Sequence, residues 1–423
     1  MKDRRLRIAV IGSGAAGIGA AYLLQHKHDV TIYERNDYIG GHTHTVIVSD
    51  GPDAGTAVDT GFIVLNDRTY PTLNRFLSQL KVPIRDSEMS FSFTCERRGF
   101  FYNGSSLNGL FAQRRNLFNM RFLRMIREIF VFNRRALKDL QAGRLAGLTL
   151  DKYLQKGFYS KAFRDDYLFP MAAAIWSTAP TRMQDFPAEY IVGFYENHGL
   201  LSLRDRPQWK TVVGGSHQYV KAFLKNFRGD VRLNTPIRRI RREAGGVAIE
   251  LPDHDIQRHD LAVIATHADE ALRLLADPSP DEKRALGAWT YERNRVTLHT
   301  DESVMPLARR AWAAWNYARE AQEGGESPVS LTYDMNRLQG LKTKSRYFVS
   351  VNRHGRIAPD SVVRELEYTH PVYTFDSLHS HDLLKSINGR NNTYYCGSYF
   401  GYGFHEDAIH SGAQVAAEFG LTL

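Results

Sequence analysis

The chain has 423 residues, of which 43% are hydrophobic and 24% charged, so it is too long for one compact core and too apolar for long disordered tracts. Its two cysteines, Cys95 and Cys396, exclude a disulfide framework and a cysteine-based zinc site, and they suit a cytoplasmic protein. The net charge of +9 is compatible with an anionic partner such as a membrane surface, and we expect no nucleic-acid partner.

The first predicted elements form a βαβ unit. Arg7–Ile11 is a short apolar run typical of a buried parallel strand, Ala15–Leu24 is a helix of small residues, and Asp29–Tyr33 is a second strand. The glycine-rich turn Gly12-Ser13-Gly14-Ala15-Ala16-Gly17 joins the first strand to the helix. In this context the backbone N–H groups and the helix dipole predict a site for a pyrophosphate.

An acidic residue follows the turn at the expected distance. Glu34 ends the second strand, about 20 residues after the turn, where a carboxylate accepts the ribose hydroxyls of a dinucleotide. A carboxylate would repel a 2′-phosphate, which argues against NADP. We expect Arg35 to lie along the adenosine or to face solvent.

The remaining elements change character along the chain. Long helical patterns rich in aromatic residues run from about Pro71 to Asp205, and strand-rich segments follow from Trp209 to Ala265. Short strands and loops then alternate up to Phe375, with a surface loop at Gly324–Pro328, before a last strand and a closing helix. The simplest arrangement is two interleaved domains.

Several segments resemble the flavin-containing amine oxidase and phytoene desaturase superfamily. Glu34-Arg35 followed by Gly40-Gly41-His42 is similar to its second cofactor signature, although His42 stands where many relatives have arginine. Further similar segments are Asp59-Thr60-Gly61-Phe62, Gly214-Gly215, Pro236-Ile237, Ala265-Thr266-His267, Gly397-Ser398, and Gly403 to Gly412. The last is similar to the motif whose helix N-terminus points at the flavin, with Asp407 where relatives usually carry glycine.

The resemblance implies FAD as cofactor and an α/β fold. It implies a Rossmann-type, glutathione-reductase-like FAD-binding domain (residues 1–75, 205–292 and 385–423) interleaved with an α+β substrate-binding domain (76–204 and 293–384). It also implies these cofactor-binding residues: Gly12, Ser13, Gly14, Ala15, Ala16, Gly17, Glu34, Arg35, Gly40, Gly41, His42, Thr60, Gly61, Phe62, Ile237, Ala265, Thr266, Gly397, Ser398, Gly403, Asp407, Ala408 and Ile409.

One branch of the superfamily is especially similar: the bacterial flavoproteins associated with cyclopropane-fatty-acyl-phospholipid synthases. The similar segments are those at Gly40, Asp59, Pro170–Ser177, Leu298–Asp301 and Ala311–Tyr317. The branch implies oxidation or desaturation of an apolar, fatty-acyl-type substrate by hydride transfer to flavin N5. Two alternatives stay open: a flavin amine oxidase, and a non-redox flavoprotein partner of a lipid-modifying synthase.

A lipid substrate is also suggested by two patterns. The helical run Leu117–Leu137 interleaves apolar residues with arginines, and it reads either as a peripheral membrane contact or as a core helix with a solvated basic edge. Aromatic residues of the second domain would line an acyl tunnel or simply fill the core: Trp176, Tyr190, Phe194, Tyr195, Trp312, Trp315, Tyr317, Tyr333, Tyr347 and Tyr373.

The catalytic group is not identified by any pattern. Many relatives carry a lysine near flavin N5, but the corresponding region here, Tyr291–Leu298, offers only Asn294 and Arg295, which weighs against amine oxidation. Candidate bases by residue type are His42, His267, His370 and His405. His42 and His44 lack a third ligand, so we expect no metal site.

Overall fold

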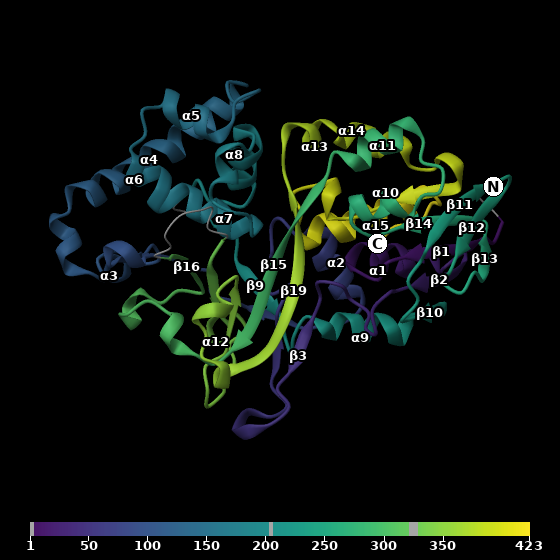
Figure 1. Cartoon of the computed structure of the whole chain (residues 1–423), viewed down its shortest axis with the longest axis horizontal. Coiled ribbons are helices and arrows are strands. Elements are labelled where there is room, and N and C mark those ends of the chain that lie inside the picture. Colours follow the sequence, from purple (N-terminus) through teal and green to yellow (C-terminus); the bar gives the residue numbers. More distant parts are fainter. Residues whose placement is uncertain (1–3, 203–205, 321–328) are drawn as a thin grey trace.

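The structure, a computed structural model, describes residues 4–202, 206–320 and 329–423. The loop predicted at Gly324–Pro328 lies outside the described residues. In Figure 1 the chain forms two halves, with β15 (Thr290–His299) and β19 (Val362–Val372) running between them. Among the described residues, no helix is long and apolar enough to cross a bilayer.

The first half is built on a five-stranded parallel sheet. Its strand order is β10-β2-β1-β14-β20. The strands are β1 (Arg7–Ile11), β2 (Asp29–Tyr33), β10 (Asp230–Arg232), β14 (Leu261–Ile264) and β20 (Thr393–Tyr395). The two central strands are apolar on both faces, because helices cover the sheet on both sides. This arrangement confirms the α/β, Rossmann-type fold expected from the sequence.

One helix packs on this sheet, and a second packs closely on the first. They are α1 (Ala15–Leu24) and α15 (His405–Ala417). A Cβ on Gly412 would stand 2.2 Å from the carbonyl oxygen of Ala16, so only glycine permits this approach. The other helices of this half are α2 (Pro71–Gln79), α9 (His217–Asn226), α10 (Ala268–Leu274), α11 (Pro280–Gly287), α13 (Phe375–His379) and α14 (His381–Ile387).

Three small sheets accompany this half. One pairs β3 (Thr45–Ile47) with β4 (Ala57–Asp59). A second has the order β5-β9-β6 (Leu65–Asn66, Trp209–Val212 and Ile84–Asp86). The third is the antiparallel series β11 (Arg239–Glu243), β12 (Gly246–Glu250) and β13 (Ile256–His259).

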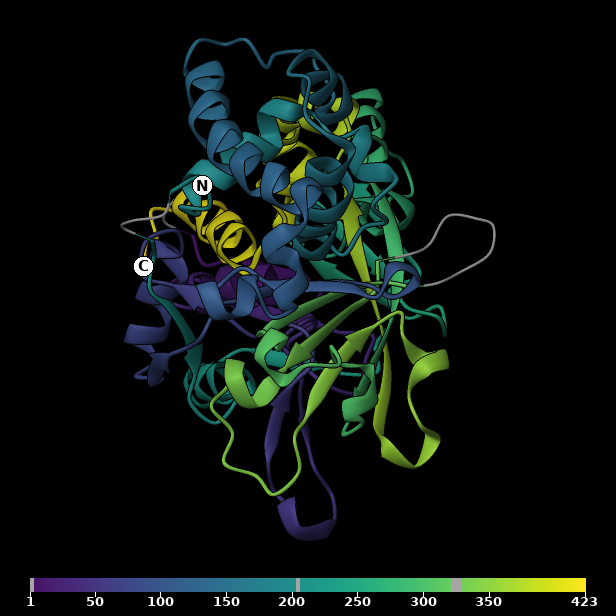
Figure 2. The same cartoon turned by 90° about the vertical axis from the view of Figure 1, so that its left-hand side faces the viewer.

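The second half combines a seven-stranded sheet with a layer of helices. The sheet order is β19-β15-β18-β17-β16-β7-β8. Its other strands are β7 (Phe91–Cys95), β8 (Phe100–Asn103), β16 (Trp315–Arg319), β17 (Leu331–Asp334) and β18 (Phe348–Val351). The helices are α3 (Leu107–Leu110), α4 (Met120–Gln141), α5 (Leu150–Lys156), α6 (Lys161–Phe163), α7 (Phe169–Trp176), α8 (Ala188–Asn197) and α12 (Met335–Leu338). Figure 2 shows most of the blue and teal helices of this layer above the green strands.

One expectation needs correction. The segment from Pro71 to Asp205 is not wholly helical, because β7 and β8 pair with each other and join the large sheet through β16. The predicted domain boundaries after residues 75 and 292 fall inside α2 and β15. Both elements are continuous, because α2 packs against α15 and β15 bridges the two halves.

Candidate active site

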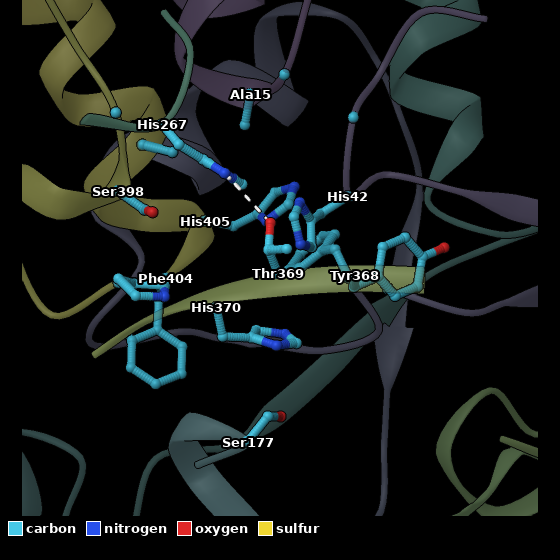
Figure 3. A pocket seen from close by; sticks show the side chains of 18 of the residues that line it. Ala15, His42, Ser177, His267, Tyr368, Thr369, His370, Ser398, Phe404 and His405 are labelled. Atoms are coloured by element: carbon cyan, nitrogen blue, oxygen red, sulfur yellow. Dashed lines mark hydrogen bonds between the residues drawn. The ribbon is translucent and has the colours of Figure 1, made fainter. Parts of the chain in front are cut away.

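A long cavity lies between the two halves and has a volume of about 930 Å³. One end is lined by the carboxyl ends of β1 and β2, and the other by the helical layer and β7, β16 and β17. Figure 3 shows the middle, where β19 places Tyr368, Thr369 and His370 opposite His42, His267 and Ser398.

The glycine turn after β1 forms one wall. Gly12 has φ +94°, and a Cβ on Gly17 would lie 2.0 Å from the Gly12 carbonyl oxygen, so both glycines are required by the backbone itself. Gly14 differs, because no protein atom lies within 4 Å of where its Cβ would stand and its φ of −66° is unstrained. Gly14 therefore leaves open space on the cavity side, which a phosphate would use.

Glu34 lies against this turn at the end of β2. Its carboxylate accepts hydrogen bonds from the Ser13 backbone N–H (2.9 Å) and hydroxyl (2.6 Å), and from the Asn36 N–H (3.0 Å). Arg35 faces largely outward and pairs with Glu270 at 2.6 Å. Glu34 is 6% exposed and lines the cavity, as a ribose-binding carboxylate must.

A second backbone approach brings Gly41, His42 and Gly61 to the cavity. A Cβ on Gly61 would lie 2.2 Å from the His42 carbonyl oxygen, and the Phe62 N–H donates to that oxygen at 2.8 Å. Phe62 stacks on the His405 ring with 3.9 Å between centroids.

The amino end of α15 meets the cavity through Gly403, Phe404, His405 and Ala408. The helix dipole there favours negative charge on a bound group. Asp407 points away: its Oδ2 accepts the Phe404 N–H at 2.8 Å and so caps its own helix. Burial raises the pKa of the Asp407 carboxyl to about 6.

Most of the predicted cofactor residues come together on the cavity wall. Eighteen line it: Gly12, Ser13, Gly14, Ala15, Ala16, Glu34, Arg35, Gly41, His42, Gly61, Phe62, Ile237, Ala265, Thr266, Gly397, Ser398, Gly403 and Ala408. Five do not: Gly17, Gly40, Thr60, Asp407 and Ile409.

Those five act through neighbours. Gly40 donates its N–H to Ser13, Thr60 bonds Tyr368, and Ile409 packs on Gly19. Gly17 closes the turn and Asp407 caps α15, as described above. Cofactor contact at these five positions stays a prediction, since their place in the structure is beside the wall and not on it.

These walls fit a flavin dinucleotide. The open space beside Gly14, the carboxylate of Glu34 and the backbone of Thr235–Arg238 would hold the ADP part. The amino end of α15 would face the ring system, which supplies hydride-acceptor chemistry when bound.

Four histidines surround the middle of the cavity. His42 lies with its ring centroid 5.6 Å from that of His370 and 6.1 Å from that of His267, while His405 bonds the Thr43 hydroxyl at 2.8 Å. Burial lowers the pKa of all four, to about 4 for His370 and about 3 for His405. They are therefore neutral near pH 7.

His370 is held by a buried amide that sequence reasoning left without a role. The Asn294 side-chain NH₂ donates to the Ser177 carbonyl and to His370 Nδ1, each at 3.0 Å, and its oxygen accepts from Asn352 at 2.7 Å. Because Nδ1 accepts, the proton of the neutral ring sits on Nε2. His370 thus presents an N–H donor on the cavity wall.

The far half of the cavity is apolar and aromatic. Its wall includes Met89, Phe91, Tyr102, Tyr167, Met171, Ile175, Leu200 and Trp209. Of the predicted tunnel aromatics, Trp176, Phe194, Trp315 and Tyr333 line it. Tyr190, Tyr195, Trp312, Tyr317, Tyr347 and Tyr373 do not; Tyr190 and Tyr373, for example, stack on each other with 4.6 Å between centroids.

Charges are distributed unevenly along the cavity. Among the described residues, the carboxylates that line the cavity are those of Glu34, Glu270 and Glu367, and all three lie on the dinucleotide side. Glu367 is placed there because it shares a face of β19 with Thr369, whose hydroxyl bonds His267. The charged side chain in the far half of the described cavity wall is Arg206, which is exposed and donates its Nε–H to the Ser202 carbonyl at 2.8 Å.

Comparison with known proteins agrees with this site. Residues 15–366 match the family described as flavin containing amine oxidoreductase. The chain is 25% identical over 338 residues to the putative flavin-containing monoamine oxidase AofH of Mycobacterium tuberculosis, covering 78% of this chain and 70% of that protein.

Solved structures share the fold over nearly the whole chain. The CLA-producing fatty acid isomerase from P. acnes superposes with a TM-score of 0.69 at 18% identity, covering 99% of each chain. Putrescine oxidase bound to putrescine superposes with a TM-score of 0.69 at 15% identity, covering 98% of this chain and 99% of that one. On these findings the chain belongs to the flavin containing amine oxidoreductase family, and it is an FAD-dependent oxidoreductase.

Proposed function

We propose that this oxidoreductase acts on an apolar, fatty-acyl-type substrate bearing an anionic group. The proposal rests on the composition of the far half of the cavity. Its described wall is apolar and aromatic, and its charged group is Arg206. The guanidinium of Arg206 would hold a carboxylate or phosphate, while the acyl chain lies between Met171, Ile175 and Phe194.

The same observation bears on a diamine substrate. An ammonium group needs its lost hydration to be offset by a carboxylate or by cation–π contact, and of these two the described far wall offers the aromatic rings. The described carboxylates of the wall lie on the dinucleotide side, and Arg206 would repel a second ammonium group. The fatty-acid isomerase with the same fold shows that this architecture accommodates fatty acids in that protein.

When bound, FAD would supply a hydride acceptor for a carbon of the substrate, and the residues of the wall would orient that carbon toward it. His370, with its Nδ1 occupied by Asn294, offers Nε2–H as a hydrogen-bond donor near the centre of the cavity. It would orient the substrate or the cofactor rather than serve as the base in this tautomer.

The proposal is tested by anaerobic mixing of the oxidised holoprotein with three panels: long-chain unsaturated acids, the same acyl chains as methyl esters, and primary amines or diamines. We expect the visible flavin band to bleach with the acids, and more weakly with the esters, which cannot pair with Arg206. Bleaching by amines alone would establish the amine oxidase function named by the curated relative instead.

The AofH similarity favours that second function. It rests on 25% identity over most of the chain, whereas the acyl proposal rests on the charges of the cavity wall. Arg206→Glu separates the two, since it should abolish bleaching by acids but improve binding of an amine.

A further inference from the structure

Exposed large apolar side chains are concentrated in one stretch of the chain. Thirteen of them are exposed among the described residues, and six lie in the segment 107–131: Leu107, Leu117, Phe118, Met120, Phe130 and Val131. Phe118 is 87% exposed and Leu107 78%. Single exposed apolar residues are ordinary, but such clustering marks an interaction surface.

The helix α4 does not turn the expected apolar face outward. Phe122, Met125 and Phe132 are buried in the core, so the side of α4 that carries them cannot contact a membrane. The outer side instead carries Met120 and Val131 among cations at helical spacing: Arg124, Arg127, Arg134 and Lys138. The structure thus combines exposed apolar residues with basic ones on the same side.

Positive charge dominates this surface. The segment from Arg114 to Lys138 holds eight basic residues and one acidic residue, Glu128, giving 8 − 1 = +7. Arg114 and Arg115 donate to the backbone oxygens of Phe111 and Gly99, which leaves their charge uncompensated. An anionic partner would supply the missing charge.

The surface is continuous with the cavity. Gly104 and Ser105 line the cavity and are exposed, and Leu107 begins α3 two residues later. Arg114 bonds Asn108 at 2.7 Å, which ties α3 to the turn Arg114–Phe118. The apolar residues therefore lie beside the end of the cavity that we assign to the substrate.

We propose that α3, the turn 114–118 and the outer side of α4 dock on an anionic phospholipid bilayer. Leu107, Phe118 and Met120 enter the acyl boundary, while the arginines contact head groups. A nucleic acid would match the charge but not the apolar residues. Docking would turn the end of the cavity at Ser105 toward the bilayer. A role of that opening in taking up substrate rests on the proposed function, whereas the docking itself does not.

The first test is cosedimentation of the holoprotein with phosphatidylglycerol-containing vesicles and with pure phosphatidylcholine vesicles. We expect binding to the anionic vesicles and at least about tenfold weaker binding for the triple variant Leu107→Ser, Phe118→Ser, Met120→Ser, since each exposed side chain loses apolar burial. The matched control is Ile47→Ser, Leu224→Ser, Ile256→Ser, three exposed apolar residues in the dinucleotide-binding half.

Absence of wild-type binding to anionic vesicles would overturn the proposal, as would equal loss in the control triple. Flavin retention reports that each variant is folded. Vesicle binding is measured without any enzymatic reaction. A failure to bind vesicles can therefore be distinguished from a failure to oxidise acyl compounds.

The second test concerns the charges. Arg114→Gln with Arg115→Gln should weaken anionic-vesicle binding roughly 30-fold, from about 1 kcal/mol for each cation near the surface, and binding should fall with added salt. The control pair Arg239→Gln with Arg241→Gln removes the same charge from exposed positions on β11. Equal binding to neutral and anionic vesicles would refute the head-group contact.

Discussion

Asn294 determines how His370 can act. Its amide satisfies Ser177, His370 and Asn352 at once, so its orientation is fixed by three bonds. Where relatives were expected to carry a lysine in this region, this chain places a buried amide that acts through a histidine on the neighbouring strand. A strongly basic ammonium is thereby replaced by a neutral N–H donor.

This network gives a residue-scale prediction. Asn294→Leu removes the side-chain donor to the Ser177 carbonyl and one of the two acceptors of the Asn352 NH₂ group, which should cost about 2 kcal/mol of stability. It also frees His370 to change tautomer, so the pH profile of flavin reduction should change. The conservative variant Asn294→Gln should recover part of the stability and part of the wild-type pH profile, measured by thermal unfolding and by anaerobic flavin reduction. An unchanged pH profile in Asn294→Leu would contradict the role assigned to Asn294.

Gly14 gives a second residue-scale prediction. Gly14→Val meets no protein atom, so the fold should survive, but the side chain would fill the pyrophosphate space and flavin occupancy should fall at least about tenfold. Gly355→Val is a matched control, because Gly355 also has open space around it and lies away from the cavity. Full flavin content in purified Gly14→Val would show that the turn does not hold the phosphates.

Some residues were predictable from sequence and others were not. The glycine turn and Glu34 were predicted because their spacing is local and fixed by one βαβ unit. Asn294 and His370 stand 76 residues apart and meet only through the β15–β19 pairing, which no local pattern specifies. Asp407 was read as a cofactor neighbour, but its carboxylate turns back to cap α15.

At the scale of elements, α15 depends on that cap. Asp407→Ala should destabilise the protein by about 1 kcal/mol through loss of the N-terminal cap, whereas Asp407→Asn, which keeps an acceptor oxygen, should cost less. Equilibrium denaturation of the holoprotein measures both. Equal losses in the two variants would mean that the hydrogen bond to Phe404 is unimportant.

The helix α4 illustrates why an amphipathic pattern alone is ambiguous. The pattern correctly predicted a helix, which the structure places at Met120–Gln141, but it could not tell whether the apolar side meets protein or lipid. Similarly, the aromatic-rich pattern did not predict β7 and β8, because β7 joins the sheet through β16, which comes more than 200 residues later.

At the scale of the whole molecule, buried histidines predict acid sensitivity. Burial lowers the pKa of His42, His198, His267, His370 and His405, to about 4 for His198. A lowered histidine pKa stabilises the fold fully above the unfolded value near 6.5, and this contribution is lost as pH falls toward 4. Asp59 and Asp407 act oppositely: burial raises each pKa to about 6, so their contribution is present at low pH and lost as pH rises.

Burial lowers the pKa of eleven histidines in all and raises that of three carboxyls, those of Asp59, Asp165 and Asp407. We therefore expect the melting temperature of the flavin-free protein to fall by at least about 5 °C between pH 7 and pH 5. His198→Asn removes one buried histidine, which lies outside the four-histidine cluster of the cavity, and should reduce this fall in melting temperature. A melting temperature that is constant over this range would contradict the burial of neutral histidines.

The division into two halves also follows from chain-wide pairing. The parallel sheet gathers strands from residues 7 to 395, so the interleaving could be inferred only from the order of several family-like segments. The positions at which the chain passes between the halves could not be inferred in this way. The cavity between the halves, with its dinucleotide end and apolar end, is the product of that crossing.

The most direct test of the account is anaerobic titration of the oxidised holoprotein with a long-chain unsaturated fatty acid, followed at the visible flavin band. The account predicts stoichiometric bleaching in wild type and its loss in Arg206→Glu, with flavin content unchanged. No bleaching by any acyl compound, together with bleaching by a primary amine, would contradict it.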